Sequence, residues 1–209
     1  MTVSDTLSRG RPRSFDVDAV LDGALELFWS GGFRTTSTRE LEAALGISQS
    51  SLYHAFGSKA GLLTAALDRY EALLDTELVV PLETRDDGLA AIADFLERLH
   101  GWVTSEGHRG CMITNLMAED GGADRVIAQR TQRYRQRVRD ALTMALRRGA
   151  QRGEIDDEAH EQRAELLLAF VLGLNIAVRG GAPQREIDAL MGAMHRQLDA
   201  WRRQDAPSP

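Results

Sequence analysis

Disulfides, membrane-spanning segments and a signal peptide are all missing from this sequence. The 209-residue chain has a single cysteine, Cys111, which excludes an internal disulfide framework. Its most apolar stretch, Leu166 to Val178, is shorter than the ~20 residues that cross a bilayer. The polar N-terminus has no apolar core of the kind that a signal peptide carries. We therefore expect a cytoplasmic protein with no membrane partner.

The residue patterns of common catalytic and metal sites are missing as well. The five histidines form no His-Glu-x-x-His pair, and the single cysteine has no Cys-x-x-Cys partner. Gly31-Gly32 and Gly180-Gly181 lack the strand–turn–helix context of a phosphate-binding loop. We therefore expect neither an enzyme nor a bound cofactor or metal ion.

Lysine is almost absent, and the net charge of −6 has the sign that disfavours binding to nucleic acid. The distribution of charge matters more than its total, because acidic residues beyond residue 60, as in Asp86-Asp87 and Glu154 to Glu158, carry most of the excess. The cations among the first 60 residues that could meet DNA are Arg9, Arg11, Arg13, Arg34, Arg39 and Lys59, the only lysine. This distribution predicts DNA binding that is sensitive to salt.

Helical periodicity is present along the whole chain. With 43% hydrophobic and 27% charged residues, the composition is that of a soluble globular protein. Apolar residues recur at helical spacing, and no segment has the signals of a strand. The first predicted helix begins at Asp16 and is ended by Ser30-Gly31-Gly32, and the fourth runs from Ser58 to about Leu78 with Pro81 in its end region. The later predicted helices cover residues 87–104, 110–118, 123–152, 158–178 and 184–202.

Two short helices lie between Phe33 and Lys59, and their ends are marked by capping residues. Ser37-Thr38-Arg39-Glu40 is a capping box, in which the Ser37 hydroxyl bonds the Glu40 amide and the Glu40 carboxylate reaches back. Gly46 suits the left-handed residue that ends the first of them, and Ser48 caps the second. The pattern predicts a helix–turn–helix whose second helix exposes short polar side chains, as a reader of the DNA major groove requires. Its expected core is Leu41, Ala44, Ile47, Leu52 and Phe56.

Several short pieces of this segment match the pattern of a known family. They are Gly32-Phe33, Thr36-Ser37, Gly46-Ile47-Ser48, Leu52-Tyr53 with Phe56, and Lys59. With these residues the chain from about Val17 to Leu67 resembles the TetR family of bacterial transcriptional regulators, although Ser50 and Ala55 depart from the glycine and histidine that the family often has there. The resemblance implies an all-α protein with an N-terminal three-helix helix–turn–helix DNA-binding domain and a C-terminal helical ligand-binding and dimerisation domain.

The expected domains are a disordered basic arm over residues 1–14, the DNA-binding domain over 15–60, and the effector-binding and dimerisation domain over 61–205. Within the arm, Arg9-Gly10-Arg11-Pro12 resembles the core of an AT-hook, whose arginines enter a narrow minor groove. A solubilising tail is the alternative interpretation of this arm.

The resemblance also implies a homodimer, joined through the last two long helices. The helix around Leu166 to Val178 is apolar nearly all round, so it must be covered on more than one side. A second copy of the chain can supply that cover. A single chain that buries both faces is the alternative.

The expected partner of the N-terminal module is a double-stranded DNA operator. Gln49 is the candidate for reading a base, since its amide can pair with adenine at two positions. Lys59 lies beside a helix N-terminus, which attracts phosphate, and the resemblance implies phosphate or base contacts for Tyr53, His54 and Lys59. An ordinary exposed polar residue is the alternative for each of them. The full set of expected DNA contacts is Thr38, Arg39, Gln49, Ser50, Tyr53, His54, Lys59 and Arg11.

A ligand pocket is expected among the middle helices, with asparagines as its polar groups. Its side chains suggest an apolar or aromatic small-molecule effector, and plain core packing is the alternative. The candidate lining residues are Trp102, Met112, Asn115, Phe170 and Asn175, with Met117 and Leu174 beside them.

Cys111 is a candidate redox site. It follows His108-Arg109-Gly110 and precedes a short helix, so its thiol is expected near a helix N-terminus and two cations, a setting that favours the thiolate. A buried small hydrophobic residue is the alternative.

The sequence therefore predicts a DNA-binding transcriptional regulator, released from a palindromic operator by a small-molecule effector. One alternative is a regulator that senses oxidants or electrophiles through Cys111. Another is a helical ligand-binding protein with a vestigial DNA-binding module. An activator has the same sequence features as a repressor.

Overall fold

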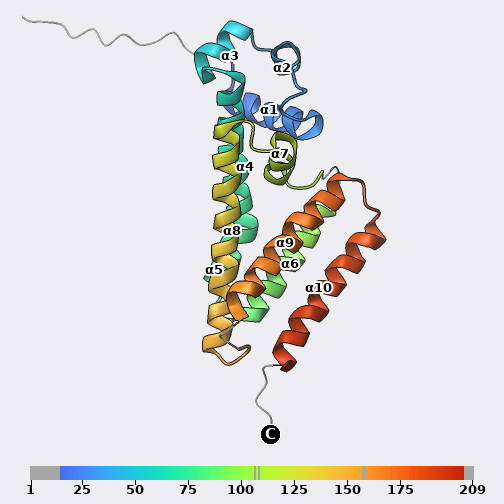
Figure 1. Ribbon diagram of the computed structural model, residues 1–209. Helices are drawn as coiled ribbons and strands as arrows, with labels where there is room; N and C mark the ends of the chain where they lie inside the picture. Colours follow the sequence, from blue (N-terminus) through green and yellow to red (C-terminus); the bar gives the residue numbers. More distant parts are fainter. Residues whose placement is uncertain (1–14, 106, 108, 157–158, 205–209) are drawn as a thin grey trace, which may run out of the picture.

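A computed structural model describes residues 15–105, 107, 109–156 and 159–204 of the chain, and these residues form helices without a strand (Figure 1). The all-α prediction is confirmed. The predicted basic arm with Arg11, and His108, lie outside the described residues. The described helices are α1 (Val17–Gly31), α2 (Thr38–Leu45), α3 (Gln49–Phe56), α4 (Lys59–Leu74), the π-helical turn η1 (Asp75–Val79), α5 (Val80–Thr84), α6 (Gly88–Val103), α7 (Met112–Asp120), α8 (Arg125–Gln151), α9 (His160–Arg179) and α10 (Gln184–Gln204).

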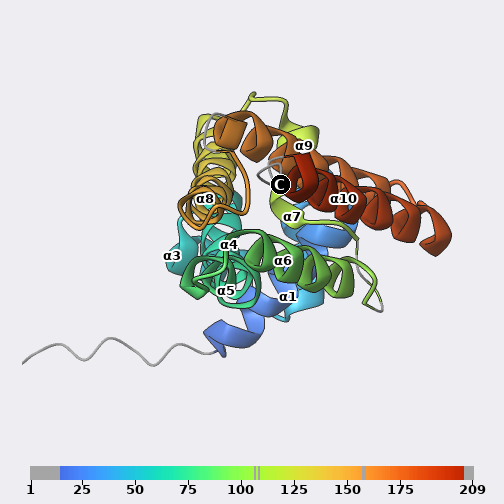
Figure 2. The ribbon, with the colours of Figure 1, turned by 90° about the horizontal axis from the view of Figure 1, so that it is seen from below.

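The first three helices gather at one end of the molecule, away from the last turn of α10 (Figure 1). From there α4, η1 and α5 continue as one long rod, and α8 packs along it. The remaining long helices, α6, α9 and α10, form the other side of the body, which Figure 2 shows from below. The short α7 lies between α1 and this body. The α1–α3 end is thus connected to the body by α4 along the chain and by α7 through space.

The apolar core is continuous between the two parts. Val20, Ala24 and Phe28 of α1 belong to the same buried cluster as Leu62 and Ala66 of α4. The cluster then continues through α6 and α8 into the body. Helix α4 is thus packed against both parts.

Helices α6 and α8 approach each other most closely at two glycines. A Cβ atom on Gly88 would overlap the backbone of Gly149, so only glycine permits this packing. Next to the contact, the amide of Leu89 donates to Oε2 of Glu154 at 2.8 Å. This bond satisfies one of the free amides at the start of α6.

Pro81 does not end the fourth helix, contrary to the expectation from sequence. The helical rod passes through Pro81 and ends only at Thr84. The reason is η1, in which the amide of Val80 bonds the carbonyl of Asp75, five residues back. The wider π turn relieves the clash between a proline ring and the carbonyl of the preceding turn, and Pro81 then stands in the first turn of α5, where proline is tolerated.

No helix in the described part of the chain combines the length and the apolar character that crossing a membrane requires.

Candidate nucleic-acid interface and internal cavity

The start of α2 has the predicted capping box. The amide of Glu40 donates to Oγ of Ser37 at 3.2 Å, and the amide of Ser37 donates to Oε2 of Glu40 at 2.6 Å. The bond from the Ser37 amide, followed by a hydrogen bond from the Ser37 side chain, holds the pKa of the Glu40 carboxyl below its usual value. The box fixes the direction in which α2 leaves the preceding turn.

The turn between α2 and α3 is equally defined. Gly46 adopts the left-handed conformation, with φ 65° and ψ 23°, and Ser48 caps α3 by accepting from the amide of Ser51 at 3.1 Å. Both features confirm the sequence prediction. A further bond was not predicted: the amide of Gln49 donates to Oε1 of Glu42 at 3.1 Å, which ties the first residue of α3 to α2. The two helices are therefore held at a fixed angle.

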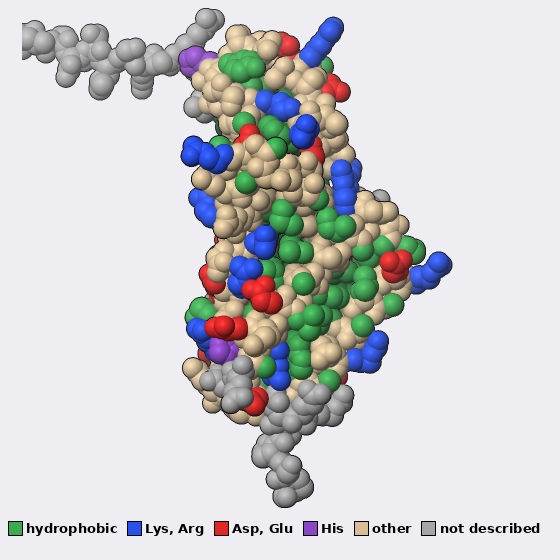
Figure 3. Space-filling model, in the orientation of Figure 1, with side chains coloured by type: hydrophobic (Ala, Val, Ile, Leu, Met, Phe, Trp, Pro, Cys, Tyr) green, Lys and Arg blue, Asp and Glu red, His purple; other side chains and the backbone are tan. Residues whose placement is uncertain are grey.

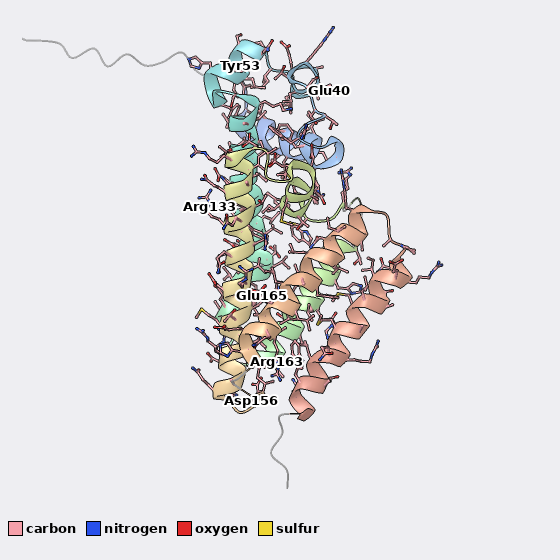
Figure 4. The ribbon with its side chains drawn as sticks, in the orientation of Figure 1. Glu40, Tyr53, Arg133, Asp156, Arg163 and Glu165 are labelled. Atoms are coloured by element: carbon pink, nitrogen blue, oxygen red, sulfur yellow. The ribbon has the colours of Figure 1, made fainter. Side chains whose placement is uncertain are left out.

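The outer face of α3 is polar and accessible. Gln49, Ser50, Tyr53 and His54 are all exposed, while Leu52 points inward and is fully buried. Figure 4 shows Tyr53 at the end of the molecule opposite to the last turn of α10. The structure thus brings the four predicted α3 contacts together on one accessible face, which is the geometry that a major-groove reader needs.

The start of α2 lies beside this face. Arg39 is exposed there and Thr38 is half-buried. Ala44 is exposed, so its prediction as a core residue is wrong. The inward face of α2 is set by Leu41 and Leu45, which are four residues apart, and Ala44 lies to one side of that line.

Lys59 has a different environment from the one expected of a phosphate contact. Its Nζ donates to the backbone carbonyls of Phe33 and Thr36, each at 2.6 Å, and lies 4.4 Å from the centre of the Phe33 ring. Burial lowers the pKa of Lys59, and the carboxylates of Glu119 and Glu40 oppose this shift. The ammonium group is therefore bonded to the backbone of the turn before α2.

An internal cavity of about 30 Å³ lies among α4, η1, α6, α8 and α9. Of the predicted ligand residues, Trp102 and Asn175 line it, and so does Cys111. Leu74 and Leu78, which stand on either side of the junction between α4 and η1, form part of the same wall. The cavity therefore touches the rod that leads to the helix–turn–helix.

Three other predicted ligand residues lie elsewhere. Met112 and Asn115 line a separate, open cleft of about 430 Å³ between α1, α7 and α9. Phe170 lines neither space and is half-buried on α9. An amphipathic pattern does not separate these positions, because α7 and α9 are apolar on more than one face.

Cys111 stands at the N-cap of α7, near a helix N-terminus as expected, and it is buried, as in the alternative interpretation. Of the two cations expected near it, Arg109 donates from Nη1 to Oε1 of Glu26 at 2.5 Å, and His108 lies outside the described residues. The thiol instead faces tyrosines: burial, followed by the proximity of Cys111, raises the pKa of Tyr70 and of Tyr134 well above its usual value. The buried thiol lacks the exposure of a reactive cysteine.

Contacts that the sequence did not indicate connect α1 to the segment beside Cys111. Nε1 of Trp29 donates to the carbonyl of Gly110 at 2.8 Å, and Nη1 of Arg179 donates to the carbonyl of Trp29 at 3.0 Å. On the other side, the amide of Cys111 donates to Oδ1 of Asn175 at 2.7 Å. The wall of the cavity is thus one residue away from a hydrogen bond to α1.

Comparison with known proteins agrees with this arrangement. The model of the bacterial regulatory proteins of the tetR family matches residues 20–66, and that of the tetracyclin repressor-like C-terminal domain matches residues 88–194. The HTH-type transcriptional repressor ComR of Escherichia coli (strain K12) is 32% identical over 193 residues, which cover 90% of this chain and 91% of ComR. The HTH-type transcriptional repressor BdcR of the same strain is 38% identical over 109 residues, covering 50% of this chain and 53% of BdcR.

Among solved structures, a cysteine mutant of the TetR family transcriptional regulator CifR, complexed with 26-base-pair double-strand operator DNA, has a TM-score of 0.80. It is 28% identical to this chain, and the match covers 92% of this chain and all of the CifR chain. Both halves of the sequence match models of one family, and a relative above 30% identity spans nearly the whole of it. The chain therefore belongs to the TetR family of bacterial transcriptional regulators.

Proposed function

We propose that this regulator is a homodimeric repressor, which a small apolar molecule releases from a palindromic DNA operator. The observation that carries the proposal is that one helical rod, α4 with η1, connects two features. Helix α3, which carries the accessible polar face, packs at one end of this rod, and the internal apolar cavity lies against the other. The repressor ComR and the operator complex of CifR support the DNA-binding part.

In the proposed complex, α3 of each subunit lies in a major groove. The two recognition helices of such a dimer read half-sites about 34–36 Å apart, one helical turn of DNA. The side chains of Gln49 and Tyr53 are exposed on that helix. In the described residues the Gln49 side chain has no hydrogen bond, so it can pair with a base without losing a partner.

Replacing Gln49 tests the reading of sequence by α3. The operator is first selected from random duplexes with the wild-type chain. Gln49→Ala should then lose about 1–3 kcal/mol of discrimination at one base position in each half-site, with an unchanged salt dependence. Arg39→Ala is the contrasting variant, because loss of a phosphate contact weakens binding to all sequences and lowers the salt slope by about one. Binding titrations in which Gln49→Ala discriminates bases like the wild type would contradict the role of Gln49.

The proposed dimer surface is an apolar face on α9 and α10. Leu166 is 47% exposed and Ile176 43% exposed, and Ala169 and Gly173 are exposed between them at helical spacing. Figure 3 shows apolar side chains gathered over these two helices. A continuous apolar surface of this kind is covered in solution, and a second copy of the same face is its self-complementary partner.

A charge on this face should separate the subunits. Leu166→Glu puts a carboxylate into the proposed interface, where its desolvation is not compensated, and is expected to sediment as a monomer and to bind the palindrome weakly. Leu73→Glu is the matched control, because Leu73 is 45% exposed on α4, outside the proposed surface. Sedimentation equilibrium decides the matter. The interface is wrong if Leu166→Glu remains dimeric, or if both variants dissociate equally.

The effector is proposed to enter the cavity beside Trp102 and Cys111. With a volume of about 30 Å³, the cavity holds no more than a few water molecules, so a ligand must displace its walls. Two parts of the cavity wall are connected to the DNA-binding end. Displacing Leu74 and Leu78 would shift the rod, and displacing Cys111 would shift the neighbouring Gly110, whose carbonyl accepts from Trp29. A ligand that favours the open cavity thereby disfavours the operator-binding arrangement.

Filling the cavity in advance should uncouple the effector. Val138 lines the cavity on α8, and Val138→Ile adds a carbon atom into it, whereas Val126→Ile makes the same change at a site on α8 that is 49% exposed. We expect Val138→Ile to raise the ligand concentration for half-release by about tenfold with little change in operator affinity. Fluorescence anisotropy of labelled operator, titrated with indole and 2-naphthol as first probes, measures this. Equal responses of the two variants to a releasing compound would place its site elsewhere.

A further inference from the structure

The turn between α1 and α2 has its backbone polar groups bound from two sides. On one side, the amides of Phe33 and Arg34 donate to the two carboxylate oxygens of Glu119, at 3.1 and 2.6 Å. On the other side, the carbonyls of Phe33 and Thr36 accept from Nζ of Lys59. One peptide segment thus lies between a carboxylate and an ammonium group, with its dipoles oriented favourably toward both.

The two charged residues come from different parts of the molecule. Lys59 is the first residue of α4, and Glu119 is near the end of α7, within the C-terminal family domain. The segment between them leads directly into Ser37, the N-cap of α2. Hydrogen bonds to this short turn therefore fix the position of α2 relative to the C-terminal domain. Helix α3 follows, because Glu42 binds it to α2.

We propose that Glu119 and Lys59 are positioning residues for operator recognition, which hold the α1–α2 turn between them, and that Lys59 acts in this way and not as a phosphate contact. The inference rests on operator binding by the helix–turn–helix but not on release by an effector. A failure of the effector proposal therefore leaves it intact.

The direction in which removing Glu119 changes operator affinity distinguishes a positioning role from a long-range effect of its charge. Removing a negative charge from a DNA-binding protein favours binding through long-range attraction. Glu119→Ala should instead weaken specific operator binding by about tenfold, because two amides lose a charged acceptor and the turn loses its position. Glu119→Gln keeps one carbonyl acceptor and should recover part of the loss. Glu77→Ala is the matched control: Glu77 is exposed, and its side chain has no bond to the described residues.

Lys59 is tested by the salt dependence of binding. If Lys59 positions the turn, Lys59→Met lowers specific affinity while the slope of log affinity against log salt stays that of the wild type. If Lys59 holds a phosphate, the slope falls by about one. Arg133→Met is the matched control for loss of a cation, because Arg133 is exposed on α8 and points away from the body (Figure 4).

The double variant completes the experiment. Residues that hold the same turn are coupled, so Lys59→Met with Glu119→Ala should cost no more than the more harmful single change. Thermal unfolding and binding to random duplex accompany each titration. The expected result is native-like melting, unchanged non-specific binding and reduced specific binding. The proposal is overturned by additive losses, by a reduced salt slope in Lys59→Met, by tighter operator binding of Glu119→Ala, or by equal losses on specific and random DNA.

Discussion

The requirement that buried backbone groups find hydrogen-bond partners shapes the junction between the two domains. The α1–α2 turn belongs to no helix, and apart from the bond of the Thr36 amide to the Gly32 carbonyl, its central amides and carbonyls are bound by side chains. Glu119 and Lys59 provide them, and each lies on an element that is itself packed in the core. This arrangement also determines where α3 lies. The capping box fixes α2 to the turn, and the bond from the Gln49 amide to Glu42 fixes α3 to α2.

Packing and hydrogen bonds also connect the cavity to the DNA-binding end. The rod formed by α4, η1 and α5 contributes Leu74 and Leu78 to the cavity wall and is buried against α1 at its other end. A parallel route runs through Gly110, whose carbonyl accepts from Trp29 and whose neighbour Cys111 lines the cavity. A Cβ on Gly110 would overlap the carbonyl oxygen of Asn175, so the tight path of this segment needs glycine. Both routes are chains of packed or bonded groups, the kind of connection through which the proposed effector would act on the helix–turn–helix.

Interactions within three or four residues could be predicted from sequence, and those across the fold could not. The capping box of Ser37, the left-handed Gly46 and the cap by Ser48 are confirmed, since each depends on local chemistry alone. Pro81 was misjudged because the π turn before it makes room for its ring. The environment of Lys59 and the role of Glu119 depend on partners 26 and 86 residues away, for which spacing gives no signal. The DNA contacts of Gln49, Tyr53 and the other α3 residues, and the ligand role of Trp102, stay predictions.

The central claim is that the α1–α2 turn is held from outside by Glu119. Amide hydrogen exchange, followed residue by residue in the full chain without DNA, tests it most directly. The account predicts slow exchange at Phe33 and Arg34 in the wild type and fast exchange at both in Glu119→Ala, with the amide of Gly46, which bonds within α2, unchanged. Exchange of Phe33 and Arg34 at the rate of an unprotected peptide in the wild type, or protection that survives the loss of Glu119, would contradict it.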